Sequence, residues 1–186
     1  GIAQVCAMAG YDVCLTDADP TGLQRGLDRV VANLDKGVER GKVTDAERDA
    51  ALANLSGAES MEVACDQAWM VVEAVPEILE LKRKLLKAAS EIAPPGCIVA
   101  TNTSSLSVGA IADGITSPGR VIGTHYFNPV HIMALLEIVV ADVTRDEVVA
   151  ETRAFGERIG KQVIVVRDAP GFATSRLGVA LGMEAI

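Results

Sequence analysis

Aromatic residues are scarce in this sequence. Phe, Tyr and Trp together make up 3% of the 186 residues, whereas apolar residues of all kinds make up 49%. The core must therefore be built mainly from Val, Ile, Leu and Ala. This composition suits an α/β protein better than a β-sandwich or a β-barrel, which usually contain more aromatic side chains.

Positive charge is also in short supply. The chain has 17 Lys and Arg residues against 25 Asp and Glu residues, which gives a formal net charge of −8. This balance argues against a general electrostatic attraction to nucleic acid or to an anionic membrane, and neither is expected as a partner. A phosphorylated ligand would have to be held locally, by backbone amides and a few placed cations.

The sequence has no long hydrophobic run and few cysteines. No apolar segment approaches the roughly 20 residues that a membrane span needs, and no signal-peptide pattern opens the chain. The four cysteines show no CxxC spacing and lie in apolar runs: Cys6, Cys14, Cys65 and Cys97. We expect them to be buried free thiols, with no metal site, in a cytoplasmic protein or one of an organelle matrix.

Apolar segments and turn residues predict strands that alternate with helices. Strands are expected over 11–16, 68–74, 97–101, 121–125, 135–140 and 162–166. Helices are expected over 1–9, 20–40, 78–92, 106–112 and 146–159, with another after the Thr44 cap and a last one after Pro170. Strands that are continuous apolar runs separated by helices indicate a parallel sheet covered on both faces.

Asp17 is the first candidate functional residue, because it directly follows the strand predicted over 11–16. In a dinucleotide-binding unit, an Asp at this place accepts hydrogen bonds from the ribose hydroxyls of the adenosine. Asp19 follows without a nearby Arg in the sequence, so the 2′-phosphate of NADP would meet negative charge and NAD is favoured. The alternative is that Asp17 only caps the turn. The glycine-rich loop that would decide between the two should precede Gly1.

Polar residues also follow two other predicted strands. In the segment Asn102 to Leu106, Ser104 or Ser105 could simply cap the next helix. In the segment Gly123 to Pro129, His125 ends a strand, where a histidine is often only structural.

Glu137 changes the interpretation of His125. It lies twelve residues after His125, in the apolar run LLEIVV, where a carboxylate is costly to bury without a partner. The intervening loop allows the two strand ends to approach each other. We therefore expect Glu137 to hold the His125 ring and to favour its charged form.

Four blocks occur in one order and with one spacing: EAVPEILELKRKLL, ATNTSSLS, GTHYFNPVHIMALLEIV and DAPGFATSRL. Together they resemble the nucleotide-binding domain of the 3-hydroxyacyl-CoA dehydrogenases, especially of the bacterial 3-hydroxybutyryl-CoA type, over essentially the whole chain. The resemblance implies a Rossmann-type, doubly wound, mostly parallel sheet with a helical excursion. Residues 1–167 would form the NAD-binding domain, and 168–186 would begin a helical substrate and dimerisation domain.

The start of the sequence, Gly1 to Gln4, resembles the family just after its GxGxxG loop. We therefore expect the first strand and this loop to be missing, together with nearly all of the helical C-terminal domain. The chain alone is expected to be inactive. Its full-length parent is expected to be an active homodimer.

The resemblance also implies the roles of individual residues in the NAD-dependent conversion of an (S)-3-hydroxyacyl-CoA to the 3-ketoacyl-CoA. His125 would be the general base and Glu137 its orienting partner. Ser104 would bind the 3-oxygen of the substrate, and Asn128 would lie close by. The expected lining of the NAD site is Asp17, Glu73, Ala74, Glu77, Lys82 and Asn102.

The CoA moiety is expected near the helical excursion of residues 21–55. Lys36, Arg40 and Lys42 form the densest basic group there. The alternative for these three residues is an ordinary solvated helix face.

Three departures from the family pattern concern the substrate. Ser175 stands where an Asn is common, and His131 and Ala134 replace a Pro and a Lys. These changes concern the preference for the acyl group more than the chemistry. Two other functions stay open. One is a dehydrogenase of a free hydroxy acid, of the carnitine or gulonate type, which would share the nucleotide-binding domain and the His–Glu pair, and the other is a non-catalytic nucleotide-binding relative that kept the fold.

Overall fold

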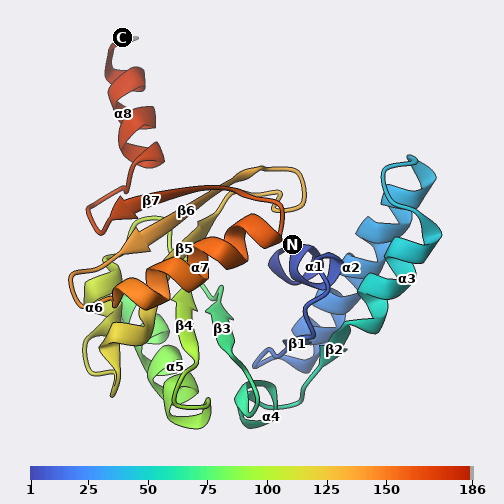
Figure 1. Cartoon of the computed structure of the whole chain (residues 1–186), viewed down its shortest axis with the longest axis horizontal. Helices are drawn as coiled ribbons and strands as arrows, with labels where there is room; N and C mark the ends of the chain where they lie inside the picture. Colours follow the sequence, from blue (N-terminus) through green and yellow to red (C-terminus); the bar gives the residue numbers. More distant parts are fainter. Residues whose placement is uncertain (185–186) are drawn as a thin grey trace.

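The computed structural model describes residues 1–184, in which helices and strands alternate along most of the chain (Figure 1). The elements are α1 (Ile2–Met8), β1 (Val13–Leu15), α2 (Pro20–Glu39), α3 (Asp45–Ala53), β2 (Leu55–Gly57), α4 (Met61–Cys65), β3 (Met70–Glu73), α5 (Leu79–Ile92), β4 (Ile98–Thr101), α6 (Val108–Ala112), the 3-10 helix η1 (Pro118–Arg120), β5 (Val121–Tyr126), β6 (Leu135–Val140), α7 (Asp146–Arg158), β7 (Gln162–Arg167) and α8 (Thr174–Glu184). The last two residues of the segment predicted to follow the NAD-binding domain, 185–186, lie outside the described residues.

The strands form two separate sheets. Five of them pair in the order β3-β4-β5-β6-β7, and β1 and β2 form a parallel pair of their own. Strand β6 is antiparallel to β5 and parallel to β7, while the β3–β4 and β4–β5 pairs are parallel. The predicted α/β class and mostly parallel sheet are confirmed. Strands β5 and β6 form the antiparallel pair of this sheet, because loop 127–134 turns the chain back without a crossover helix.

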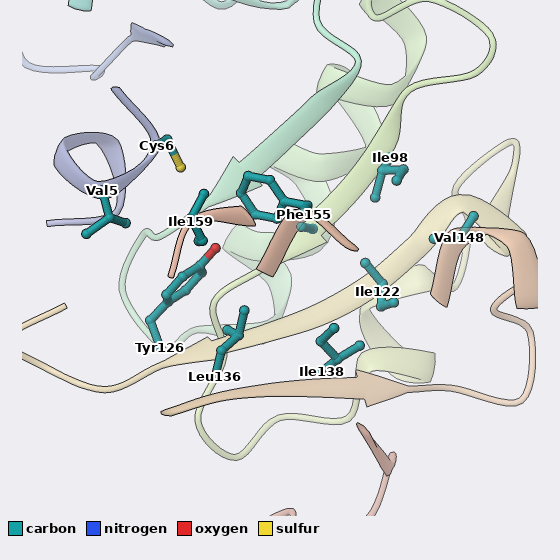
Figure 2. Close-up of a cluster of buried hydrophobic side chains, with 11 residues drawn as sticks. Val5, Cys6, Ile98, Ile122, Tyr126, Leu136, Ile138, Val148, Phe155 and Ile159 are labelled. Carbon is teal, nitrogen blue, oxygen red and sulfur yellow. The ribbon is translucent and has the colours of Figure 1, made fainter. Parts of the chain in front are cut away.

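Both faces of the five-stranded sheet are covered, because its strands bury successive side chains in opposite directions. On one face, Ile122 and Ile138 pack with Val148 and Phe155 of α7 in the cluster that Figure 2 shows. On the other face, Val121 and Val139 belong to a second cluster. That cluster also contains Leu86 of α5 together with Val108 and Ile111 of α6. The aliphatic core expected from the scarcity of aromatics is therefore present on both faces.

Helix α2 begins and ends close to the predicted positions, and helix α3 begins where the sequence predicts. Asp19 caps α2 and Pro20 stands at its start, and Gly41, with φ +63°, follows its end. Thr44 and Glu47 form the expected capping box of α3. Strand β2 and helix α4 were not predicted, because elements of three and five residues are too short for a hydrophobic period to be recognised.

Three of the few aromatic side chains connect the β1–β2 pair to the rest of the molecule. Tyr11 precedes β1, Trp69 precedes β3, and Phe155 lies on α7. Their ring centroids are 5.4 to 5.7 Å apart, and the Arg158 guanidinium lies 4.5 Å from the centre of the Tyr11 ring. Aromatic pairs at such distances and tilts add to the stability that burial alone provides.

The four cysteines are free thiols, as expected, but Cys14 is exposed, so the prediction that all four are buried is wrong there. Cys14 is exposed because successive side chains of a strand point to opposite faces, and only its neighbours Val13 and Leu15 lie on the partly buried face of β1. Among the helices of residues 1–184, none combines the length and the hydropathy needed to cross a membrane.

Candidate functional site

The candidate site lies where the strands of the five-stranded sheet end. Because β3, β4 and β5 run parallel, their carboxyl ends meet at one edge of the sheet, with Glu73, Thr101 and His125 at or near these ends. Strand β6 begins at the same edge because it is antiparallel to β5. Ligands of open α/β sheets bind outside the carboxyl ends of the strands.

His125 and Glu137 face each other directly across the β5–β6 pair. The Nδ1 atom of His125 lies 2.6 Å from the Oε2 atom of Glu137, and the Glu137 side chain is fully buried. The contact expected from the sequence is therefore present. With Nδ1–H donating to the carboxylate, the neutral ring leaves Nε2 unprotonated, which is the state that a base requires.

The Glu137 carboxylate also binds the turn before α8. Its Oε1 atom accepts from the backbone N–H groups of Ala173 and Thr174, at 3.1 and 3.0 Å. Its Oε2 atom accepts from the Thr174 hydroxyl at 2.9 Å. Burial by itself would raise the pKa of Glu137, but the hydrogen bonds from His125, Thr174 and Ala173 hold it below the usual value. Glu137 is therefore a stable anion beside the His125 ring.

Two phenylalanines surround the His125 ring. The centroid of Phe127 is 4.5 Å from that of the imidazole, and the centroid of Phe172 is 5.8 Å away. Phe172 is 2% exposed and has φ +46°, directly after Gly171 with φ +74°. This tight turn places one aromatic ring against His125 and, one and two residues later, the donors to Glu137.

The ends of β3 and β4 hold a second buried carboxylate. Glu73 and Lys82 form an ion pair at 2.8 Å, and both side chains have 0% exposure. Glu73 also accepts from the Thr101 hydroxyl at 2.7 Å and from the Val75 N–H at 2.6 Å. Glu73 and Lys82, predicted to line an NAD site, thus direct their side chains at each other. Ala74 is exposed beside them.

Glu77 joins the start of α5 to the loop after β4. Its Oε1 atom accepts from the Thr103 hydroxyl at 2.6 Å and from the backbone N–H groups of Ser104 and Ser105 at 2.9 and 3.1 Å. Although partial burial opposes it, these bonds and nearby Lys82 lower the pKa of Glu77 to about 2. The carboxylate therefore stays ionised and fixes the 103–105 loop.

The same contacts correct one alternative for Ser104 and Ser105. Neither residue caps helix α6, because the Ser107 hydroxyl accepts from the Ala110 N–H at 3.1 Å and provides that cap. The Ser104 hydroxyl lies instead 3.3 Å from Glu77 Oε1.

Asn102 and Asn128 occupy different places at this edge. The Asn102 side-chain oxygen accepts from the Tyr126 N–H at 3.0 Å and ties the end of β4 to the end of β5. Asn128 is exposed at the start of the loop after β5, joined to Pro129 by a cis peptide bond. Lys161, which the sequence did not single out, donates to the carbonyls of Val130 and Met133 and fixes this loop.

Asp17 is exposed just after β1, and its Oδ1 atom accepts from the Asp19 N–H at 2.9 Å. Both predicted roles are therefore compatible with its position: it holds the turn, and it presents a carboxylate where a ribose can bind. The statement that no Arg is near Asp19 is wrong. Arg25 Nη2 lies 3.3 Å from Asp19 Oδ2, in an exposed pair that a local sequence pattern did not reveal because it spans six positions of α2.

The other predicted substrate-binding residues, and Lys36 with them, are exposed. Lys36, Arg40 and Lys42 are exposed at the α2–α3 turn, which Figure 1 shows at the far tip of the helical hairpin. Ser175 is exposed in the first turn of α8. Within residues 1–184, no group of three or more His, Cys, Asp or Glu side chains is arranged to hold a metal ion.

The sequence and the fold of this chain are similar to those of known proteins. The family model described as "3-hydroxyacyl-CoA dehydrogenase, NAD binding domain" matches residues 1–169. A probable 3-hydroxybutyryl-CoA dehydrogenase of Bacillus subtilis is 37% identical over 186 residues, covering 100% of this chain and 64% of that protein. The crystal structure of (S)-3-hydroxybutyryl-CoA dehydrogenase PaaH1 from Ralstonia eutropha superposes with a TM-score of 0.93 at 36% identity, covering 99% of this chain and 65% of that one. M. tuberculosis FadB2 gives a TM-score of 0.94 at 33% identity, with 99% and 65% covered. The chain thus spans about two thirds of the length of these relatives.

Proposed function

Because this chain belongs to the NAD-binding domain family of the 3-hydroxyacyl-CoA dehydrogenases, we propose that it is part of an enzyme that oxidises 3-hydroxyacyl-CoA, or reduces the 3-ketoacyl-CoA. The observation that carries the proposal is the His125–Glu137 pair, buried at the strand ends with a contact of 2.6 Å. A pair of this kind suits a reaction that removes a proton from a hydroxyl group.

The proposed task of His125 is to accept the proton of the substrate's 3-hydroxyl at Nε2. Glu137 holds the ring through Nδ1 and stabilises the positive charge that the ring then carries. Positioned acid–base catalysis of this kind typically contributes a factor of about 10²–10⁴. NAD, when bound, supplies the acceptor for the hydride of C3.

The proposed NAD site is lined by residues that follow strands of both sheets. Asp17 offers an exposed carboxylate for the adenosine ribose, and Ala74 is exposed at the end of β3. Asn102 lies between the ends of β4 and β5, next to the proposed base. The buried Glu73–Lys82 pair would support this surface from below.

Ser104 and Asn128 are the proposed substrate contacts, since both lie in loops that directly follow strands of this edge. The hydrogen bonds from Ser104 and Ser105 to Glu77 give their loop a fixed geometry. A contribution of Ser175, Arg40 and Lys42 to binding of the CoA thioester remains part of the proposal, as does a homodimer of the complete protein.

The test is a comparison of substrates with the complete gene product. We expect NADH formation with 3-hydroxybutyryl-CoA to exceed that with free 3-hydroxybutyrate, carnitine or gulonate by at least about 10-fold in kcat/KM, because the CoA moiety provides binding energy that a free acid lacks. Faster turnover of a free acid would favour the dehydrogenase of a free hydroxy acid. NAD binding without turnover of any of these compounds would favour the non-catalytic relative.

A further inference from the structure

We infer that Thr174 is a positioning residue that keeps the proton affinity of the His125–Glu137 pair low, so that His125 stays an unprotonated base into more acidic solution. This inference rests on the proposed function, because it assigns Thr174 a part in the acid–base step. Thr174 is not among the residues to which the family resemblance assigns a role, and it lies directly before Ser175.

The geometry that carries the inference is a shared oxygen atom. Glu137 Oε2 accepts from His125 Nδ1 at 2.6 Å and from the Thr174 hydroxyl at 2.9 Å. The other oxygen, Oε1, is held by two backbone N–H groups, from Ala173 and Thr174. The Glu137 side chain has 0% exposure, so solvent cannot simply replace the hydroxyl.

Two donors on one carboxylate oxygen compete for the same negative charge. A hydrogen bond from Thr174 stabilises the Glu137 anion whether or not His125 is protonated, but it leaves less charge for the imidazolium to use. The protonated ring is therefore stabilised less than it would be with Oε2 to itself. Removing the Thr174 hydroxyl should raise the pH at which the His125–Glu137 pair takes up its proton. This proton uptake belongs to the pair as a whole, because the two groups share one hydrogen bond.

The turn that presents Thr174 is well anchored. Gly171 and Phe172 have φ values of +74° and +46°, and this conformation folds the chain back over Glu137. The Phe172 ring, 2% exposed, packs against His125. The hydroxyl position thus follows from the turn and from a buried ring.

Other titratable or charged groups on the surrounding elements are common to all variants of Thr174. They are Glu73 at the end of β3, Glu77 before α5, Lys82 on α5, Tyr126 at the end of β5, His131 in the loop after β5, Lys161 before β7, Arg167 at the end of β7, Asp168 after it, and Arg176 on α8. Asp168 is engaged by the Ser107 hydroxyl at 2.8 Å, and Arg176 is exposed. A comparison between variants of Thr174 therefore isolates the hydroxyl group.

The experiment uses the complete gene product with Thr174→Val, Thr174→Ala and Thr174→Ser. We expect the acidic limb of the pH profile of kcat/KM for 3-hydroxybutyryl-CoA to move up by about half a pH unit in the Val and Ala variants. The Ser variant keeps a hydroxyl and should stay within about 0.2 units of the wild type. A parallel NMR titration of the His125 ring, assigned with His125→Gln, should show the same displacement without substrate.

The pH profile and the NMR titration distinguish a failure of the inference on Thr174 from a failure of the proposed function. Unchanged midpoints in the Val and Ala variants, or an equal displacement in the Ser variant, would overturn the role of Thr174. A fall in kcat at all pH values with no displacement would assign Thr174 a purely structural role and would overturn the inference too. If the wild type has no dehydrogenase activity, the proposed function fails, and the NMR titration still decides the inference. If the Val variant does not fold, the Ala and Ser variants decide it.

Discussion

Two strand ends at one edge of the sheet each hold a buried carboxylate against a basic side chain. At β3, Glu73 contacts Lys82 at 2.8 Å, and at β5–β6, Glu137 contacts His125 at 2.6 Å. Both carboxylates have fully buried side chains, yet the basic partners differ: Lys82 has 0% side-chain exposure, whereas His125 has 11%. The first pair is enclosed, and the second retains a path to the surface.

The difference explains why one pair suits a structural role and the other a chemical one. An imidazole exchanges a proton near neutral pH and has a second nitrogen to do so, whereas an ammonium in an ion pair only donates. In the enclosed pair, the Glu73 carboxylate also accepts hydrogen bonds from the Thr101 hydroxyl and from the Val75 N–H. Similar distances therefore do not imply similar functions.

The largest effect should come from removing the proposed base. His125→Gln keeps a polar side chain but cannot take a proton, so we expect kcat with 3-hydroxybutyryl-CoA to fall by about 10²–10⁴-fold. NAD affinity should change little, because Glu137 remains to hold the turn before α8. Steady-state kinetics and calorimetry of the complete gene product are the measurements.

A matched control for this variant is His131→Gln, since His131 is the other histidine and is exposed in the loop after β5. It should keep kcat within about twofold of the wild type. Turnover of the His125 variant above a tenth of the wild-type value would refute the assignment of the base.

Breaking the enclosed Glu73–Lys82 pair should lower the stability of the fold more than the activity. Lys82→Met leaves Glu73 buried without its cation, and removal of one partner of a buried pair typically costs about 3–5 kcal/mol. Lys84→Met on the exposed side of the same helix should cost less than about 0.5 kcal/mol. Urea unfolding of both variants gives the comparison. Equal stabilities would mean that Lys82 contributes no more than a surface lysine.

Much of this arrangement could be predicted from the sequence, for physical reasons that can be stated. A carboxylate in the apolar strand LLEIVV requires a partner, and the short loop after His125 allows only nearby strand ends to meet. Hydrogen-bond partners that are backbone N–H groups, or hydroxyl groups of Ser and Thr, cannot be recognised in this way, because such groups occur throughout the sequence. Thr174, which reaches Glu137 across 37 positions, and the Tyr126 N–H that binds Asn102 belong to this second kind.

Arg25 and strand β2 show two other limits of the sequence. The Arg25–Asp19 contact depends on side-chain rotamers on an exposed helix, which the pattern of residue types does not determine. Strand β2 has the sequence Leu-Ser-Gly and is held in place by its pairing with β1, so its own propensity did not identify it.

Glu77 provides an intermediate case, because its side chain is 34% exposed and contacts both Lys82 and the 103–105 loop. Its pKa in the folded protein is lowered to about 2, so its contribution to stability is present above the unfolded value of about 4.3 and is lost as the pH falls toward 2. We expect Glu77→Gln to cost about 1 kcal/mol at pH 6, after allowance for solvent screening.

The pH dependence tests the cause of this cost. Urea unfolding of the wild type and of Glu77→Gln should give curves that converge as the pH is lowered from about 4.5 to 2, because the wild-type carboxyl group then becomes neutral. A difference in the free energy of unfolding that stays constant over this range would show that the amide replaces the carboxylate equally well and that its charge is unimportant.

The smallest effect concerns Asp17, a third strand-end carboxylate, which is exposed and receives its hydrogen bond from a backbone N–H. Its position depends on Gly22, because a Cβ atom added there would lie 3.1 Å from the Asp17 carboxylate carbon.

Gly22→Ala should displace the carboxylate by a few tenths of an ångström and weaken NAD binding about threefold. Gly26→Ala, in the same helix, places its Cβ in ordinary contact 3.7 Å from Leu15 and should leave NAD affinity unchanged. Both changes replace a helical Gly by Ala and should stabilise α2 by similar amounts, up to about 1 kcal/mol. Calorimetry with NAD on the complete gene product therefore separates the position of Asp17 from helix stability, and equal affinities in the two variants would show that Asp17 needs no such placement.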